Sequence, residues 1–215
     1  MMNPLREEMT LLLTDWCEGL LRHQIHDPDD VSRHGGLRCP DCGIVHGRCG
    51  DALYPFLKMA RETGDDRWVR AAAAVQQWSD TASRDDGSFV NEVEGNHWNG
   101  ITVFAALALS EALHFHGDLL TAEASARWTR RLERAAHWIN GIDWADHGTI
   151  NYPISAAAAL ASAGRVLQDE TLLQTARHWG TWARDYFLPD GILFGEGPRP
   201  PTIRGIYAVD ALYNL

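Results

Sequence analysis

The sequence lacks an excess of basic charge, and this absence excludes a large class of partners. It has 19 Lys and Arg against 29 Asp and Glu, which gives a formal net charge of −10. A protein that binds nucleic acid must neutralise phosphates with a basic face, so nucleic acid is not an expected partner. An anionic membrane surface is disfavoured for the same reason.

The sequence also lacks a long apolar run. Near its start only residues 11–13 are continuously hydrophobic, and acidic residues flank them, which does not fit the core of a signal peptide. No stretch reaches the ~20 apolar residues that a membrane helix requires, so no membrane partner is expected. We therefore expect a cytoplasmic location. There the four cysteines are expected as thiols or metal ligands rather than as disulfides.

Tryptophan, by contrast, is abundant, with nine in 215 residues, and its spacing indicates an internal repeat. Trp68 and Trp78 are ten residues apart, and Trp128 and Trp138 repeat this spacing sixty residues later. A weaker third copy has Leu172 and Trp182. Eight residues after the second member of each copy, a turn containing Asp and Gly begins, at Asp86, Asp146 and Asp190. The chain is thus expected to repeat one structural unit.

Two kinds of segment alternate within this repeat. Residues 101–113 and 154–163 are apolar almost throughout, which is typical of a helix buried on every side. The segments with paired Trp are amphipathic instead. Their apolar stripes are predicted to consist of Trp68, Ala72, Val75 and Trp78 in one copy and of Ala124, Trp128, Leu132, Ala135 and Ile139 in the next. Arg127, Arg130, Arg131 and Arg134 are expected largely on the opposite, outer face.

This alternation predicts an all-α fold, an α/α toroid of helical hairpins, in a single domain over residues 1–215. The expected hairpins are 48–79, 99–139 and 152–186, after an opening helix at 4–24. A further inner helix is expected to begin near Ile206, where residues 210–213 repeat residues 51–54, so that the chain is truncated after about three and a half hairpins. Long loops on one side only, and unequal steps of 60 and 44 residues between Trp positions, favour a toroid over an open solenoid.

Residues 50–72, with the sequence GDALYPFLKMARETGDDRWVRAA, carry a resemblance to a known family. They resemble a hairpin of the unsaturated glucuronyl hydrolases and related glycosidases. In that hairpin an Asp opens the inner helix and Thr-Gly-Asp precedes the outer one. The resemblance implies a toroid of six hairpins acting on sugars that contain uronic acid, with Asp51 as the acid/base residue. It extends weakly over about three-quarters of the chain.

The expected function is therefore a glycoside hydrolase that cleaves glucuronyl or unsaturated uronyl oligosaccharides. Glycoside cleavage uses two carboxyl groups across the scissile bond, so Glu196 or Asp210 is the expected partner of Asp51. An N-cap of the inner helix is the structural alternative for Asp51. No cofactor is required for this chemistry. The residues expected to bind the oligosaccharide lie in the long loops: His46, Arg48, His97, Trp98, Asn99, Asn151 and Arg204.

Two other functions fit the same residues. A uronate-specific polysaccharide lyase would use Tyr152 as the base near the uronate α-carbon, together with Asn151 and either His46 or His97. A lyase creates a conjugated C=C bond and a hydrolase does not, so the absorbance of the product separates them. The other possibility is a helical-repeat module that binds without catalysis.

Cysteine is concentrated in one loop. Cys39, Cys42, His46 and Cys49 lie within eleven residues and form a chemically complete tetrahedral zinc set. The Pro and Gly residues between them permit tight turns. A structural zinc site is one interpretation of this loop, and a loop with buried thiols is the other.

Overall fold

The computed structural model describes residues 4–147, 151–185 and 187, and within these ranges the protein is all-α. Their backbone contains isolated β-bridges but no strand. No helix described there is both long and apolar enough to cross a membrane. The elements are α1 (Pro4–His23), η1 (Gly47–Ala52), α2 (Leu53–Thr63), α3 (Asp66–Thr81), α4 (Thr102–His116), η2 (Gly117–Leu119), α5 (Ala122–Asn140), α6 (Asn151–Leu167) and α7 (Glu170–Arg184), where η denotes a 3₁₀ helix.

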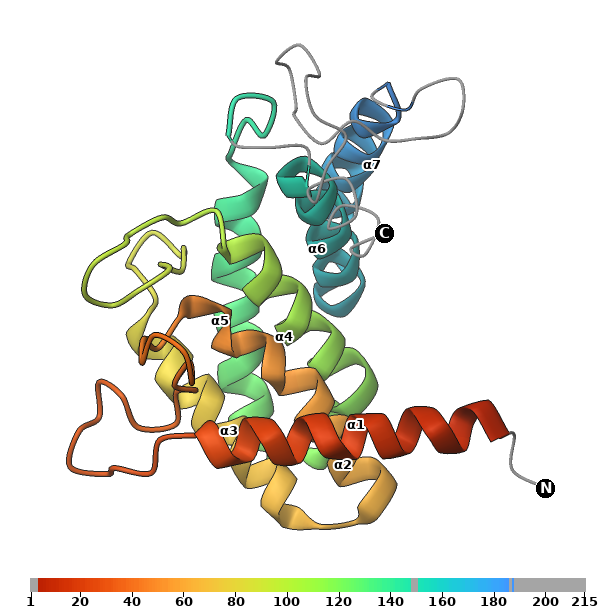
Figure 1. The fold of residues 1–215 in the computed structure, drawn as a ribbon. Helices are drawn as coiled ribbons and strands as arrows, with labels where there is room; N and C mark the ends of the chain where they lie inside the picture. The colour runs from red at the N-terminus through yellow and green to blue at the C-terminus, as the bar shows by residue number, and fades with distance from the viewer. Residues whose placement is uncertain (1–3, 148–150, 186, 188–215) are drawn as a thin grey trace.

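The helices after α1 form three hairpins, α2–α3, α4–α5 and α6–α7 (Figure 1). α2, α4 and α6 pack in series as an inner row, and each contacts the outer helix that follows it. The hairpins predicted from the Trp repeat are confirmed, and they follow one another as in an arc of an α/α toroid. The predicted inner helix near Ile206 lies outside the described residues.

The burial of side chains matches the predicted division into inner and outer helices. On α4, Val103, Ala106, Leu109 and Ala112 expose at most 1% of their surface. On α5 the stripe of Trp128, Leu132, Ala135 and Ile139 is fully buried, and so is the corresponding stripe of α3. Apolar burial at the spacing of successive helix turns is what holds each outer helix against its inner partner.

Arg131 departs from the predicted pattern. The sequence places it with the exposed arginines of α5, but only 5% of its surface is accessible. The loop after α3 folds over α5, and the guanidinium carbon of Arg131 lies 3.9 Å from the centre of the Phe89 ring. Its Nη2 donates hydrogen bonds to the carbonyls of Gly87 and Ser88, at 2.9 and 3.2 Å. Burial lowers the pKa of this guanidinium to about 10.

Short turns join each inner helix to its outer helix, as predicted, and polar side chains cap the outer helices. Asp65 accepts a hydrogen bond from the backbone of Arg67 at the start of α3, and Asp169 accepts one from Thr171 at the start of α7. The third turn begins only after Leu167, because α6 continues through Gly164. A Cβ atom at Gly164 would lie 2.8 Å from the Leu173 side chain, so glycine there permits close packing of α6 on α7.

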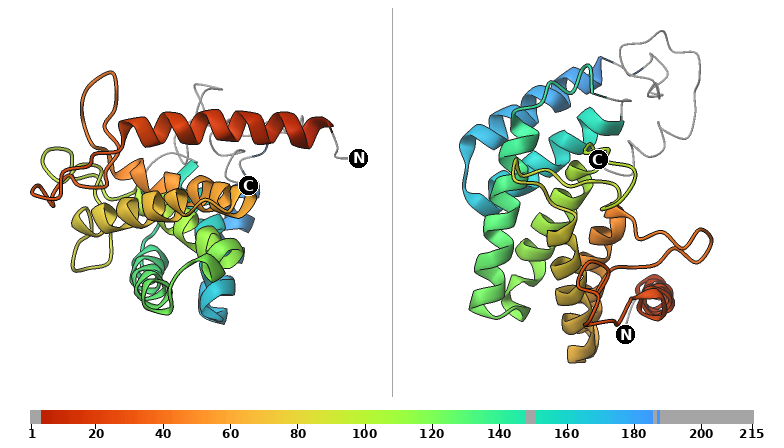
Figure 2. Two further views of the ribbon diagram at one scale, coloured as in Figure 1. Left: turned by 90° about the horizontal axis from the view of Figure 1, so that it is seen from below. Right: turned by 90° about the vertical axis from the view of Figure 1, so that its left-hand side faces the viewer.

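α1 lies across the hairpins and extends beyond them (Figure 2). It packs on α2, where Cys17 is its one fully buried residue. Large apolar side chains of α1 remain 50–64% exposed: Leu5, Met9, Leu11, Leu12 and Trp16. Contiguous exposed apolar side chains favour association with another apolar surface.

We predict that the isolated chain self-associates through α1. Replacing Met9 and Leu12 together by Gln should shift the protein towards monomer, because it removes two exposed apolar side chains from one helix. Sedimentation velocity across a concentration series measures the shift. Gln at Val31 and Val93, which are exposed in loops, serves as the matched control and should leave association unchanged. A parent protein that is monomeric at every concentration contradicts the prediction.

Candidate functional site

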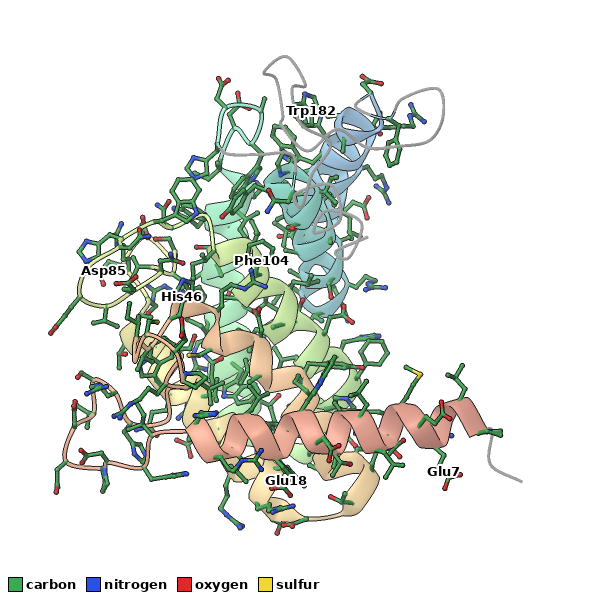
Figure 3. The ribbon with its side chains drawn as sticks, in the orientation of Figure 1. Glu7, Glu18, His46, Asp85, Phe104 and Trp182 are labelled. Atoms are coloured by element: carbon green, nitrogen blue, oxygen red, sulfur yellow. The ribbon has the colours of Figure 1, made fainter. Side chains whose placement is uncertain are left out.

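The long connections all run from an outer helix, or from α1, to the start of an inner helix. Residues 24–52 lead into α2, residues 82–101 into α4, and residues 141–150 into α6. In Figure 3, His46 lies before α2 and Phe104 lies in the first turn of α4, at this loop-bearing end of the hairpins. The starts of the three inner helices, where most of the predicted site residues lie, are therefore at this end.

A hydrogen bond between Trp98 and Tyr152 connects two of these helix starts. The indole Nε1 of Trp98, in the loop before α4, donates to the phenol oxygen of Tyr152 on α6 at 2.9 Å. Their rings meet edge to face with centroids 5.6 Å apart. The Phe104 ring packs on the Tyr152 ring with centroids 5.8 Å apart, and the Trp144 ring stacks on the Tyr152 ring with centroids 6.5 Å apart. Because Trp98 uses the phenol oxygen only as an acceptor, the O–H of Tyr152 is free to donate.

His147 completes this aromatic group. Its ring stacks on Trp98 with centroids 4.9 Å apart and meets Trp144 edge to face at 5.1 Å. Burial lowers the pKa of His147, so the imidazole is neutral at pH 7. Its Nε2 is buried and has no hydrogen-bond partner in the described part of the chain. The sequence reasoning missed His147. Its available signal was the His inserted between Asp and Gly in the second copy of the repeated turn.

Arg48 and Asp51 form a second group, in η1 and immediately before α2. Nε of Arg48 donates to Oδ2 of Asp51 at 2.6 Å, and the guanidinium carbon lies 3.9 Å from the centre of the Phe104 ring. The backbone N–H of Arg48 donates to Nδ1 of His46 at 3.2 Å. Since Phe104 contacts both Arg48 and Tyr152, the two groups are adjacent.

The pKa of Asp51 is raised by burial, although the Arg48 guanidinium beside it and His46 act in the opposite direction. About 39% of its side chain remains exposed. The N-cap interpretation of Asp51 is wrong, because α2 has Ala52 at its N-cap and no side chain caps it. The carboxyl pairs with Arg48 instead and helps to line a cavity of about 370 Å³ between α1, α2 and α4. Trp16, Tyr54 and Phe104 provide aromatic walls there.

The remaining predicted residues are not all brought to this site. His97 is exposed in the loop before α4, where its carbonyl accepts a hydrogen bond from Arg84. Asn99 accepts a hydrogen bond from Thr102 through its backbone carbonyl, in the turn that starts α4. Asn151 is buried at the start of α6, next to Tyr152. Glu196, Arg204 and Asp210 lie outside the described residues.

The cysteine-rich loop does not assemble the predicted zinc set. Among residues 4–147, 151–185 and 187, no group of three or more His, Cys, Asp or Glu is arranged to hold a metal. Cys49 is buried, donates from its thiol to the carbonyl of Leu37 at 3.4 Å, and has its pKa raised to about 11 by burial. Cys42 is exposed, and Nδ1 of His46 already accepts a hydrogen bond from the backbone N–H of Arg48. The buried-thiol interpretation fits Cys49.

Comparison with known proteins now assigns the family. The family model described as the ulvan lyase N-terminal domain matches residues 13–215. The chain belongs to this family. It is also 36% identical over 209 residues to a broad-specificity ulvan lyase of Formosa agariphila, an alignment that covers 95% of this chain and 33% of that protein. The chain thus spans about a third of the length of this relative. No solved structure matches it.

The comparisons change the expectation drawn from residues 50–72. The resemblance to glucuronyl hydrolases is not supported, and neither is the glycoside hydrolase as the leading function. Thr-Gly-Asp and a Pro after an aromatic are turn and helix-start features, so they recur wherever a helical hairpin has this geometry. The lyase alternative is the one that the family favours.

We predict that His147 makes the protein sensitive to acid. The unfolded imidazole takes up a proton near pH 6.5, whereas the folded one does so only at lower pH because burial lowers its pKa. Between these values the unfolded chain binds more protons, so the free energy of unfolding falls as the pH falls. In His147→Gln the free energy of unfolding should therefore fall less than in the parent between about pH 7.5 and about pH 5.5. Urea unfolding at these two pH values measures the difference.

His178→Gln, at an exposed position on α7, is the matched control and should retain the pH dependence of the parent. Equal pH dependence in the parent and in His147→Gln would contradict the prediction.

Proposed function

We propose that this chain provides the helical part of a polysaccharide lyase that acts on a uronate-containing polysaccharide of the ulvan type. The family and the 36% identical ulvan lyase support this proposal. The observation that carries it within the chain is the Tyr152 phenol. Trp98 orients it at the loop-bearing end of the inner helices, next to an arginine that is held in place by Asp51.

The chemistry of a lyase defines what the site has to supply. A base removes the proton from the carbon next to the uronate carboxylate, and the electrons of that C–H bond form a C=C bond. The glycosidic oxygen leaves from the neighbouring carbon with its bonding electrons and receives a proton. Charge accumulates on the uronate carboxylate meanwhile, so donors or a cation must face it.

Tyr152 is the residue that we assign to proton transfer. In its phenolate form it takes the proton from the carbon next to the uronate carboxylate, and the resulting phenol gives that proton to the leaving glycosidic oxygen. Trp98 donates to the phenol oxygen, and Tyr152 is half-buried rather than enclosed. His147 acts as a positioning residue, because its ring stacks on the indole that holds the phenol. Asn151 precedes Tyr152 at the start of α6 and is buried there.

Arg48 is the residue that we assign to the uronate carboxylate. Its Nε is engaged by Asp51, and its guanidinium lies on Phe104, while the side chain remains 44% exposed. The two terminal NH₂ groups can therefore bind a carboxylate through two parallel hydrogen bonds. Asp51 then serves to orient Arg48 rather than to transfer a proton.

Tyr152→Phe tests the assignment of proton transfer. It keeps the ring that packs on Phe104 and Trp144 but removes the hydroxyl, so turnover should fall by roughly 10²–10⁴-fold. The ultraviolet absorbance of the new C=C bond, with ulvan as substrate, measures turnover. Tyr54→Phe, which removes a phenol hydroxyl from the wall of the cavity lined by Arg48 and Asp51, is the matched control and should retain most activity. Full activity in Tyr152→Phe removes Tyr152 from the mechanism.

Asp51→Asn separates a positioning role from acid catalysis. The amide can still accept a hydrogen bond from Arg48, so under the lyase proposal KM should rise several-fold and kcat should change little. If Asp51 were the general acid of a hydrolase, kcat would fall by roughly 10²–10⁴-fold and the product would show no new absorbance. Asp118→Asn is the control, because Asp118 also pairs with an arginine, Arg61, at the opposite end of the hairpins.

A further inference from the structure

A groove on the outer side of the molecule contains a cluster of arginines that the proposed chemistry does not use. Its volume is about 440 Å³, and it lies between the end of α3 and the middle of α5. It is lined by Asp80, Ser83, Arg127, Arg130, Arg131 and Arg134. Four guanidinium groups therefore face one carboxyl group, in a chain whose formal net charge is −10. It shares no lining residue with the Tyr152 and Arg48 groups.

Arg131 is the buried member of this cluster. One of its nitrogens, Nη2, donates to the carbonyls of Gly87 and Ser88, but its Nε and Nη1 are buried and have no hydrogen-bond partner among the residues that the structure describes. No ion pair is formed by Arg131 within the described part of the chain. A buried cation without a paired anion is costly, so the arrangement favours an anion in the groove.

Asp80 is a weak counter-charge for the cluster. Its carboxylate accepts a hydrogen bond from Gln76 at 3.1 Å, and burial raises its pKa, although Gln76 and the guanidinium groups of Arg131, Arg127 and Arg134 act in the opposite direction. It forms no ion pair with the four arginines that line the groove, because their nitrogens lie more than 4 Å from its carboxylate oxygens. The groove thus keeps a positive potential.

The other three arginines are exposed on one face of α5. Arg127, Arg130, Arg131 and Arg134 are spaced by three, one and three residues, which brings them together on the helix surface. Arg134 donates to the carbonyls of Arg84 and Asp85, and so holds the loop that carries Phe89. Arg127 and Arg130 are exposed at the rim and form no ion pair among the described residues, so the guanidinium groups of both can contact a ligand.

We propose that this groove binds oxyanion groups of an acidic polysaccharide, either carboxylates or sulfate esters, at a second site away from Tyr152. The polysaccharide as ligand rests on the proposed function. The planar forks of guanidinium groups match the geometry of both oxyanions. A second site on the outer face holds a long chain between successive cleavages, and a short oligosaccharide cannot reach both sites at once.

The test replaces both rim arginines, Arg127→Gln with Arg130→Gln. The matched control is Arg70→Gln with Arg184→Gln, which changes the net charge equally at exposed positions on α3 and α7 outside the groove. Binding of polymeric ulvan is measured by calorimetry at low salt. The groove variant should bind roughly tenfold more weakly than the parent, and the control variant should bind as the parent does.

Two other probes identify the oxyanion. Weaker binding of polygalacturonate by the groove variant assigns carboxylates, and weaker binding of dextran sulfate assigns sulfate esters. If the groove variant binds all three polymers as the parent does, or if both double variants lose affinity equally, the proposal is overturned. Melting temperatures verify that both variants fold, since none of the four replaced side chains is buried.

The readouts keep this site separate from the proposed function. Turnover of a short uronate oligosaccharide should be the same in the groove variant and the parent, while KM for the polymer should rise. A protein without lyase activity whose groove variant still loses affinity for the polymer would refute the lyase proposal and retain the groove. A groove variant with unchanged polymer affinity in an active lyase would refute the groove proposal and retain the lyase proposal.

Discussion

An inner helix that is apolar almost throughout offers polar chemistry mainly at its ends. α4 is such a helix, and its burial requires contacts with α2, α5 and α6 at once. The outer helices can then be amphipathic, and short capped turns suffice at one end of each hairpin. The longer segments are left at the other end, where Trp98, Phe104 and Tyr152 meet. Apolar burial of the inner row thereby determines where the candidate site lies.

Aromatic packing, rather than a cluster of charges, organises that site. Trp98 contacts His147 and Tyr152, and Phe104 contacts Tyr152 and Arg48. Packed rings restrict the orientation of the polar atoms that they carry, and the indole N–H of Trp98 is directed at the phenol oxygen of Tyr152. The arrangement suits a reaction in which a single phenol must be positioned closely against a carbon acid.

The hairpins could be predicted from the sequence because apolar periodicity and the Trp repeat report burial directly. The position of Asp51 before an inner helix could be predicted too. Its pairing with Arg48 could not, because a helix cap and an ion pair would both use the carboxylate oxygens of Asp51. Arg131 was misplaced because its burial depends on a loop more than forty residues earlier in the chain. His147 was missed because stacking on Trp98 arises from tertiary structure and has no spacing in the sequence.

The hydrogen bond from Trp98 to Tyr152 also has a consequence for the order of assembly. Trp98 precedes the second hairpin, and Tyr152 opens the third, so the bond exists only after the two hairpins have docked. Neither hairpin contains an oriented phenol by itself. The geometry needed at Tyr152 therefore depends on docking of the two hairpins, and a chain with these hairpins undocked would hold the same side chains without their alignment.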